Sequence, residues 1–246
     1  MNLENRFLLA ALKTSAAQRR ELLPLAAILI AAGLAGSFLA LASEVLEGET
    51  LGFDKAILLA LRDPTDPANP IGPLWLEIMM KDLTALGSIT NLALITAAVA
   101  GYLLVSGKRA AALLVLASVG GGTLLSNLFK HVFARPRPDF IAHAVDVYTA
   151  SFPSSHAMLS AVTYLTLGAL LARVEANRRS KVYVVSVAIL LTVLVGCSRL
   201  YLGVHYPTDV LAGWVVGSAW AIFCWTLAAW LQRRGQIEGQ RGPAES

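Results

Sequence analysis

Residues 110–129 read AAALLVLASVGGGTLLSNLF, a run of twenty positions without a charged side chain. Crossing the hydrocarbon core of a bilayer as a helix takes about 20 predominantly apolar residues. The apolar run is continuous, whereas a strand of a membrane barrel would alternate apolar and polar side chains. This stretch therefore predicts a membrane-spanning helix.

Five further stretches have the same character, and they are residues 22–43, 89–107, 156–172, 181–198 and 210–231. The composition agrees, because 56% of the 246 residues are hydrophobic and only 15% are charged, whereas about 25% of a soluble domain is charged. The mean hydropathy of the chain is +0.63. We therefore expect an all-α fold, a bundle of six transmembrane helices.

The segments around these spans divide the chain into three parts. Residues 1–21 place apolar and basic side chains at helical spacing, which indicates a cytoplasmic amphipathic helix, with a frayed tail as the alternative. Residues 22–231 form the membrane domain, and two short apolar runs in its first outer loop predict short interfacial helices. Residues 232–246 are polar and are expected to be a disordered cytoplasmic tail.

We expect an integral, multi-pass protein of the plasma (inner) membrane, and the distribution of the basic residues predicts its orientation. If all six stretches span, 13 of the 20 Lys and Arg residues fall on the side of the N-terminus and 7 on the other side. Cytoplasmic loops carry the excess of Lys and Arg, so both termini should be cytoplasmic. The first span should be retained, because its apolar run exceeds the 7–15 residues of a signal-peptide core.

Two classes of site are not indicated by the composition. Cys197 and Cys224 are the only cysteines, and each lies in an apolar run, so neither a disulfide framework nor a zinc site is predicted. The net charge is +4, but the basic residues do not gather in one segment as they do in a nucleic-acid site. The expected partner is therefore the bilayer and not nucleic acid.

A first polar cluster follows the third span, at residues 130–138 (KHVFARPRP). Lys130 and Arg137 are seven residues apart, which is two helical turns, so both cations would project from one face while the helix continues. Pro136 and Pro138 should end the helix and hold the arginine in an extended turn. Two cations at a membrane interface suit a phosphate, because arginine offers a bidentate fork and lysine a point charge. The alternative is that these side chains only reach toward lipid headgroups.

A second cluster, Phe152-Pro153-Ser154-Ser155-His156, precedes the fourth span. Ser154 or Ser155 suits the N-cap of that helix, and the free N–H groups at a helix start attract anions. His156 beside them would exchange protons near neutral pH. Taken singly, a histidine at this position is also typical of a membrane interface.

The third cluster joins the fifth and sixth spans, at residues 198–209 (SRLYLGVHYPTD). Pro207 suits a first helical turn, which puts Asp209 in that turn, four residues after His205. The carboxylate would accept a proton from one ring nitrogen and leave the lone pair of the other free. A histidine oriented in this way beside Arg199 suits a phosphoryl-accepting nucleophile. A helix-capping aspartate and an incidental histidine are the alternative.

All three clusters fall on the predicted outer side, and together they resemble the signature of the type 2 phosphatidic acid phosphatases, relatives of the vanadium-dependent haloperoxidases. The resemblance covers residues 85–231 and includes the order and internal spacing of the motifs. Arg135-Pro136 repeats the arginine–proline pair Arg137-Pro138. We assign Arg137 to the signature, because its distance from Lys130 is the one that the family pattern uses. Ser155 stands where the family usually has glycine; serine adopts a positive φ less freely but keeps the backbone N–H.

The resemblance implies a membrane phosphatase that needs no metal or other cofactor, and it implies a role for each residue. His205 is the nucleophile and forms a phosphohistidine, Asp209 orients it, and His156 transfers protons. The implied phosphate-binding residues are Lys130, Arg137, Ser154, Ser155 and Arg199. The three cations among them take the place that a metal would fill.

The implied substrate is a lipid phosphate, because a headgroup reaches the outer membrane boundary while its tails stay in the bilayer. Candidates are an isoprenyl diphosphate such as undecaprenyl diphosphate, phosphatidic acid and phosphatidylglycerol phosphate. One alternative is a phosphotransferase of the same family. Another is a transporter or lipid-binding protein, which would carry charges inside the spans, yet Lys181, at a boundary, is the only charged residue within the six ranges.

Overall fold

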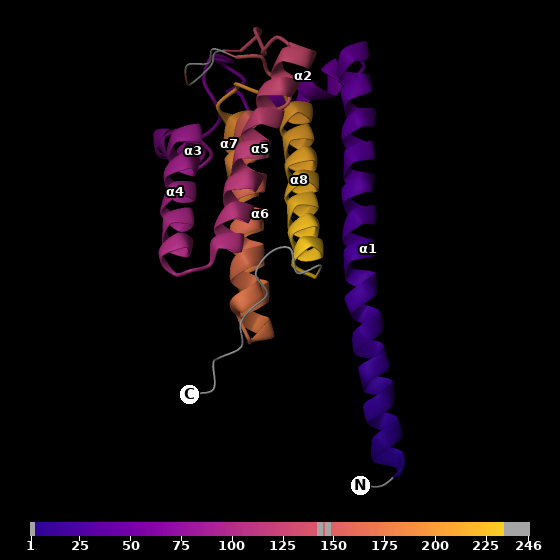
Figure 1. Cartoon of the computed structure of the whole chain (residues 1–246). Helices are drawn as coiled ribbons and strands as arrows, with labels where there is room; N and C mark the ends of the chain where they lie inside the picture. Colours follow the sequence, from indigo (N-terminus) through magenta and orange to yellow (C-terminus); the bar gives the residue numbers. More distant parts are fainter. Residues whose placement is uncertain (1–2, 142–144, 146–148, 234–246) are drawn as a thin grey trace.

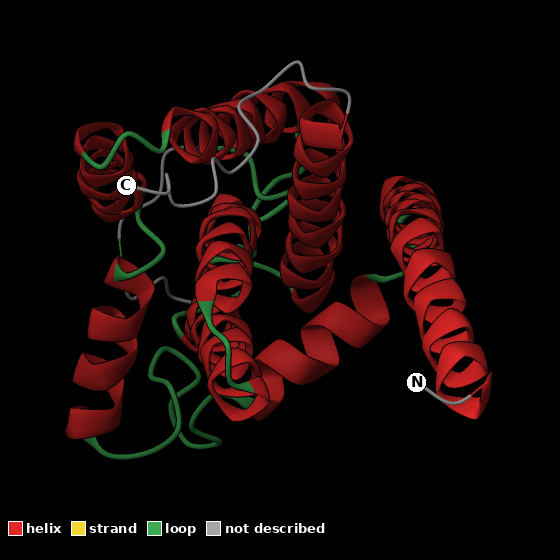
Figure 2. Ribbon diagram, turned by 60° about the horizontal axis from the view of Figure 1, so that its bottom comes forward, coloured by secondary structure: helices red, strands yellow, loops and turns green. Residues whose placement is uncertain are grey.

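Helices make up almost all of the described chain. The computed structural model describes residues 3–141, 145 and 149–233, with their side chains from residue 24 onward. Figure 2 shows these residues as helices joined by loops, with no strand among them. The helices are α1 (Leu3–Glu47), α2 (Leu51–Ala60), α3 (Leu74–Ala85), α4 (Ile89–Val105), α5 (Arg109–Phe133), α6 (Ser155–Val174), α7 (Arg178–Tyr201) and α8 (Pro207–Arg233). The expected all-α fold is confirmed.

Five helices are long and apolar enough to cross a membrane by themselves. They are α5, α6 and α7 over their whole lengths, α1 over Pro24–Glu47 and α8 over Pro207–Gln232. With 17 residues, α4 is shorter than the roughly 20 that a straight span needs. Together with α3, from which it is bent by 48°, it makes a sixth candidate. The expected helical membrane bundle is thus confirmed, with five spans, or six if α3 and α4 cross the membrane together as one bent span.

The segment between α1 and α4 contains the two short helices that its apolar runs predict, α2 and α3. The segment between them folds back on itself, because Arg62 and Pro70 form an isolated antiparallel bridge. Gly72 then turns the chain into α3 with a φ of 97°, a backbone conformation that glycine adopts readily. Both helices lie at the same end of the bundle (Figure 1).

The ends of the chain correspond in part to the predicted segments. Residues 3–21 are helical and continue directly into the first span as part of α1 (Figure 1). Their predicted place on the inner membrane surface stays a prediction. The predicted polar tail, residues 232–246, lies outside the described residues from position 234 onward.

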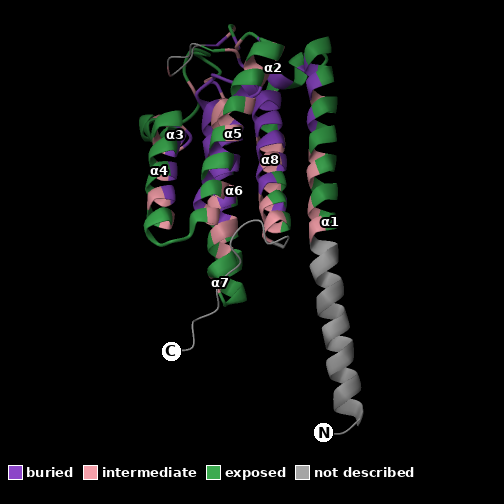
Figure 3. Cartoon of the chain, in the orientation of Figure 1, coloured by how far each residue is buried: buried purple, intermediate pink, exposed green. Residues whose placement is uncertain are grey.

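The central helix of the bundle is α6, which contacts α5, α7 and α8. Buried residues gather in α6, in α8 and in the loop between α7 and α8 (Figure 3). Glycines let the helices approach closely, since a Cβ at Gly217 would lie 2.5 Å from the Met158 carbonyl oxygen. A Cβ at Gly121, in the triple glycine of α5, would likewise lie 2.5 Å from Trp220. The triple glycine therefore serves helix packing, as expected for small residues in membrane helices.

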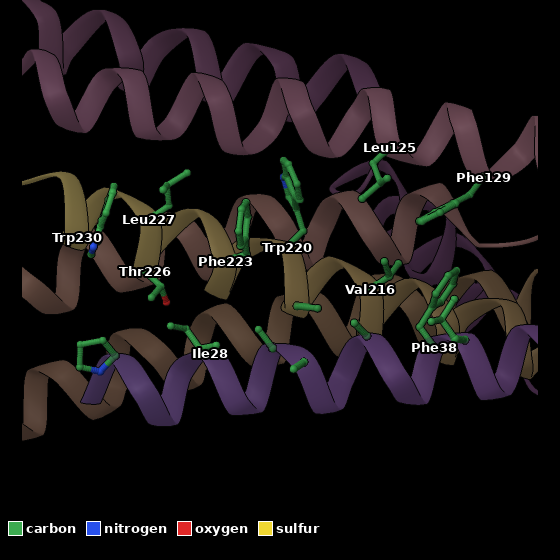
Figure 4. Close-up of a pocket in the computed structure, with 16 residues that line it drawn as sticks. Ile28, Phe38, Leu125, Phe129, Val216, Trp220, Phe223, Thr226, Leu227 and Trp230 are labelled. Carbon is green, nitrogen blue, oxygen red and sulfur yellow. The ribbon is translucent and has the colours of Figure 1, made fainter. Parts of the chain in front are cut away.

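A cavity of about 830 Å³ lies between α1 and the pair α5 and α8 (Figure 4). Its walls are almost wholly apolar, and Trp230 lies at one end and Phe38 and Phe129 at the other. Phe38 stacks on Phe152 with ring centroids 5.9 Å apart. This aromatic contact connects the lining of the cavity to the second polar cluster.

The three polar clusters meet at one end of the bundle. α5 and α7 end there, and α6 and α8 begin there, beside α2 (Figure 1). The first residues of α1 and the last residues of α8 lie at the opposite end (Figure 1). Segments far apart in the sequence thus supply the side chains of a single site.

Candidate active site

His205 and Asp209 form a buried pair in the third cluster. His205 lies in the loop between α7 and α8 with 1% of its surface exposed, and Asp209, fully buried, lies in the first turn of α8. The two side chains approach to 3.4 Å, from His205 Nδ1 to Asp209 Oδ2. The predicted spacing of four residues therefore brings the carboxylate to one ring nitrogen and leaves Nε2 on the other side of the ring.

Ser151 is part of this pair, although the sequence did not point to it. Its hydroxyl donates to Asp209 Oδ2 and lies 3.4 Å from His205 Nδ1. Its backbone N–H donates to the carbonyl oxygen of Arg135 at 2.8 Å. A serine just before the second cluster is too common a feature to predict such a contact, so only the folded chain reveals it.

Arg137 lies against the free side of the imidazole. Its Nη1 is 3.2 Å from His205 Nε2 and also donates to the Val204 carbonyl oxygen. Its Nε donates to the Thr149 carbonyl oxygen at 2.8 Å. Because a guanidinium only donates, His205 Nε2 accepts in this contact, and the ring proton resides on Nδ1, facing the carboxylate. This is the tautomer that the third cluster predicts.

Lys130 and Arg137 converge as expected, but not by helical periodicity. α5 ends at Phe133, and Ala134 turns the chain out of the helix with a φ of 43°. Arg137 therefore approaches from the segment beyond the helix, between the two prolines that were expected to end it, and not from the face of α5 that carries Lys130. Lys130 Nζ donates to the Ala150 carbonyl oxygen and to the Thr149 hydroxyl, 3.3 Å away. Both cations thus bind the same short segment that precedes the second cluster.

Arg199, on the last turn of α7, is 4% exposed. Its Nη1 donates to the hydroxyl of Thr84, near the end of α3, at 2.8 Å. Its Nε is buried and has no hydrogen-bond partner among the described residues. A buried guanidinium N–H without an acceptor is costly, so this donor is available for a ligand oxygen. Thr84 was not a predicted site residue.

The three cations act together on the nucleophile candidate. Burial first, and then the charges of Arg137, Arg199 and Lys130, hold the pKa of the His205 imidazole well below its usual value of 6.5. The side chain is therefore neutral, with an available lone pair at Nε2. A phosphate, which is anionic, would be attracted by the same charges that keep the imidazole neutral.

The start of α6 forms the anion-attracting part of the second cluster. Ser154 is the N-cap, and its Oγ accepts from the Ala157 N–H at 3.5 Å. Ser154 is fully buried, and its own N–H donates to the Asp209 carbonyl oxygen at 3.0 Å, which joins the starts of α6 and α8. The next N–H groups, of Ser155 and His156, have no acceptor within the helix, as in any first turn.

Ser155, in the position of the family's glycine, begins α6 and does not have a positive φ. The lower tolerance of serine for positive φ therefore has no consequence here. Its hydroxyl pairs with that of Ser126 on α5, with 2.8 Å between the oxygens. Ser126 is one helical turn before Lys130, so this bond joins the first cluster to the second.

His156 follows in the first turn of α6 and is partly exposed. It makes no hydrogen bond with another side chain among the described residues, in contrast to His205. A Cβ added to Gly87, in the turn between α3 and α4, would lie 3.4 Å from the His156 ring. The bend between α3 and α4 therefore borders the site beside this histidine.

Arg135, the second arginine of the first cluster, lies on the opposite side of the His205–Asp209 pair. Its Nη1 donates to Asp209 Oδ1 at 2.6 Å, and its Nη2 donates to Asp54 Oδ2 at 2.8 Å. The family spacing excluded it from the phosphate-binding set, and its contacts are indeed with carboxylates. Asp54, on α2, was not a predicted site residue, although an acid within the apolar run LGFDKAILLA is an unusual feature.

The residues around His205 form a site suited to an anion. Its described surroundings offer three cations and free helix N–H groups, and no group of three or more His, Cys, Asp or Glu side chains that could hold a metal ion occurs in the described residues. A neutral histidine with a free lone pair beside bound anionic oxygens is arranged for attack on phosphorus.

Known proteins with similar sequences share this region. The sequence model of the PAP2 superfamily matches residues 111–233, which include all three clusters. Phosphatidylglycerophosphatase B of Bacillus subtilis is 33% identical over 186 residues, covering 73% of this chain and 85% of that protein. The undecaprenyl-diphosphatase of Sulfolobus acidocaldarius is 31% identical over 120 residues, covering 47% of this chain and 52% of that protein.

A solved structure has a similar fold over most of its length. The crystal structure of a transmembrane PAP2-type phosphatidylglycerolphosphate phosphatase from Bacillus subtilis superposes with a TM-score of 0.71 at 30% sequence identity. The superposition covers 86% of this chain and 98% of that one. The likeness therefore extends beyond the motif region to the helix bundle that carries it.

Proposed function

The chain belongs to the PAP2 superfamily, and on this premise we propose that it is a lipid phosphatase with His205 as its nucleophile. The membrane bundle and the phosphatase relatives are the starting point. The finer assignments, which are the nucleophile, the proton-transfer residue and the phosphate-binding residues, rest on the geometry of the site.

One observation carries the proposal. His205 is buried between Asp209 at Nδ1 and Arg137 at Nε2, at 3.4 Å and 3.2 Å. The carboxylate directs the proton to Nδ1, and the cation on the other side marks where an anionic oxygen would bind. A structural histidine has no need of a cation at its lone pair, whereas a phosphoryl acceptor does.

The proposed reaction has two steps. His205 Nε2 attacks phosphorus, an N–P bond forms as the bond to the leaving oxygen breaks, and His156, which becomes protonated when the anionic phosphate offsets the three cations, gives its proton to that oxygen. Neutral His156 then takes a proton from water, whose oxygen attacks phosphorus and breaks the N–P bond. Asp209 stabilises the positive charge that the imidazole carries in between.

The proposed phosphate-binding residues divide into two groups. Lys130, Arg137 and Arg199 supply positive charge to the non-bridging oxygens, and the buried, unpartnered Nε of Arg199 supports its part in this. Ser155 contributes its backbone N–H, and Ser154 acts mainly by capping α6. The three cations neutralise the phosphoryl oxygens, so we propose that no metal is required.

A lipid substrate follows from the position of the site at the end of a membrane bundle. Two relatives are named for phosphatases of phosphatidylglycerophosphate and undecaprenyl diphosphate, and both names denote lipid phosphates. We propose the same class of substrate for this chain. The excess of basic residues at the opposite end supports an orientation with that end, and both termini, in the cytoplasm and the site outside.

Phosphate release from purified protein tests the proposal. The substrates are undecaprenyl diphosphate, phosphatidic acid and phosphatidylglycerol phosphate, each presented in detergent micelles. We expect release from at least one of them, and its loss in His205→Ala, with His131→Ala, an exposed histidine of α5, as the matched control. Turnover by His205→Ala would overturn the assignment of the nucleophile. Transfer of phosphate to a second lipid without free phosphate would indicate a phosphotransferase.

A further inference from the structure

Asp54 is a fully buried carboxylate on α2, outside the three motif clusters. It accepts from the Thr208 backbone N–H at 3.0 Å, the Thr208 hydroxyl at 2.7 Å and the Thr50 hydroxyl at 3.2 Å. Arg135 donates to it at 2.8 Å. A buried carboxylate with four donors from three other residues is held in one orientation. This degree of fixation exceeds what anchoring a short loop helix requires.

Arg135 connects Asp54 to the nucleophile pair. Its guanidinium donates through Nη2 to Asp54 and through Nη1 to Asp209, so one planar fork bridges two carboxylates. The guanidinium also stacks on the Tyr206 ring, 4.1 Å from its centroid, which restricts its plane. Burial lowers the pKa of Arg135, but Asp209 and Asp54 outweigh that effect and raise it. Arg135 is therefore a fixed, permanent charge.

The network places a carboxylate on each side of one guanidinium. Asp209 accepts from Arg135 through Oδ1 at 2.6 Å and turns Oδ2 toward His205 Nδ1, 3.4 Å away. The adjacent charge of Arg135 favours the ionised form of Asp209. When the imidazole becomes a phosphorylated cation, this carboxylate lies beside the new positive charge.

We infer that Asp54 and Arg135 are positioning residues that act on His205 through Asp209; the inference rests on the proposed function. Arg135 fixes the Asp209 carboxylate in the direction of Nδ1. Asp54 holds Arg135 in the orientation that reaches Asp209. The outer helix α2, which lies outside the motif region, therefore takes part in setting the geometry of the nucleophile.

The variants Asp54→Asn and Arg135→Lys test this inference in the full-length protein. Asparagine keeps the shape of Asp54 without its charge, and lysine keeps the charge of Arg135 without the fork. We expect kcat to fall about ten- to a hundredfold in each, the range known for partners that orient metal-binding histidines, with KM little changed. Phosphohistidine formation in a single turnover should slow by a similar factor. Asp82→Asn, an exposed carboxylate on α3, is the matched control.

The outcomes separate this inference from the proposed function. The kcat values are normalised to monodisperse protein from size-exclusion chromatography, so that a loss of folded protein is not counted as a loss of catalysis. Wild-type kcat in both variants, or a raised KM at unchanged kcat, would overturn the positioning role while lipid hydrolysis by His205 stands. Absence of both phosphate release and phosphohistidine in the wild type would overturn the proposed function itself.

Discussion

Arg135 and Arg137 lie on opposite sides of the His205–Asp209 pair. Arg135 Nη1 donates to Asp209 Oδ1 at 2.6 Å, whereas Arg137 Nη1 is 3.2 Å from His205 Nε2. The short arginine–proline–arginine sequence thus supplies both ends of the pair, with one cation at the carboxylate and one at the reactive nitrogen.

Replacing Arg137 should strongly impair turnover, although its side chain is only half-buried. Arg137→Ala removes a charge-assisted donor beside the proposed phosphate position, and we expect kcat/KM to fall about a hundredfold or more. Arg137→Lys should recover only part of this loss, because an ammonium lacks the fork. Initial rates of phosphate release measure the effect, with Arg178→Ala, an exposed arginine at the other end of α7, as the control. Equal rates for Arg137→Ala and the wild type would remove Arg137 from the phosphate site.

Chelators should leave the activity intact. In the proposed mechanism the three cations of the site neutralise the phosphoryl oxygens. We therefore expect phosphate release to persist after extensive dialysis against EDTA. Vanadate should inhibit, because it adopts the pentacoordinate geometry of the phosphorus during attack. Restoration of a lost activity by added magnesium would contradict this prediction, and a chelator-treated metal-dependent phosphatase serves as the positive control.

Ser155→Gly should affect stability more than catalysis. The substitution keeps the backbone N–H but removes the hydroxyl that pairs with Ser126, which is 1% exposed. We expect the free energy of unfolding to fall by about 1 kcal/mol and kcat/KM to change by less than about threefold, the factor that 0.6 kcal/mol represents. Thermal unfolding of Ser126→Ala, Ser155→Gly and the double variant measures the coupling. Strictly additive effects would show that the two hydroxyls do not interact.

Acid should destabilise the protein in part through His205. The pKa of the buried imidazole is well below 6.5, so below pH 6.5 the unfolded chain binds a proton that the folded chain does not. Stability therefore falls as the pH falls, with a slope of up to about 1.4 kcal/mol per pH unit from this one group. Above pH 6.5 the contribution of His205 is constant.

The variant His205→Gln isolates the contribution of His205 to the pH dependence of stability. The variant should lose less stability than the wild type between pH 6.5 and pH 5, as measured by unfolding temperatures in detergent. His131→Gln, an exposed histidine, should retain the full slope. Parallel curves for the wild type and His205→Gln would mean that the imidazole is not held neutral in the folded protein.

The parts of the fold that could be predicted are those that depend only on residues close together in the sequence. The length and continuity of an apolar run decide whether a helix spans a bilayer, and both are visible in a single stretch such as residues 110–129. The break between α3 and α4 was not foreseen, because it depends on how the corner at Gly87 fits against Val195 and His156. The short helices of the first outer loop were foreseen as elements, but not their contribution to the site.

The site was predictable where its residues lie within one motif. His205 and Asp209 are four residues apart across a helix start, so their approach follows from local geometry. Ser154 was a foreseeable N-cap for the same reason. Arg135 could be noticed as a repeat of the arginine–proline pair, but its partners lie on α2 and α8, and no local pattern connects them.

By itself, then, the sequence determined the membrane helices, the position of the three clusters and the pairing of His205 with Asp209, because these depend on neighbouring residues and on hydrophobicity. The family spacing selected Arg137 over Arg135 for the phosphate site, but only the tertiary structure showed that Arg137 lies beside the imidazole and that Arg135 bridges two carboxylates. It also brought in Ser151 and Asp54. Asp54 meets Thr208 across 154 positions of the chain, and a contact over that separation results from the packing of the whole bundle.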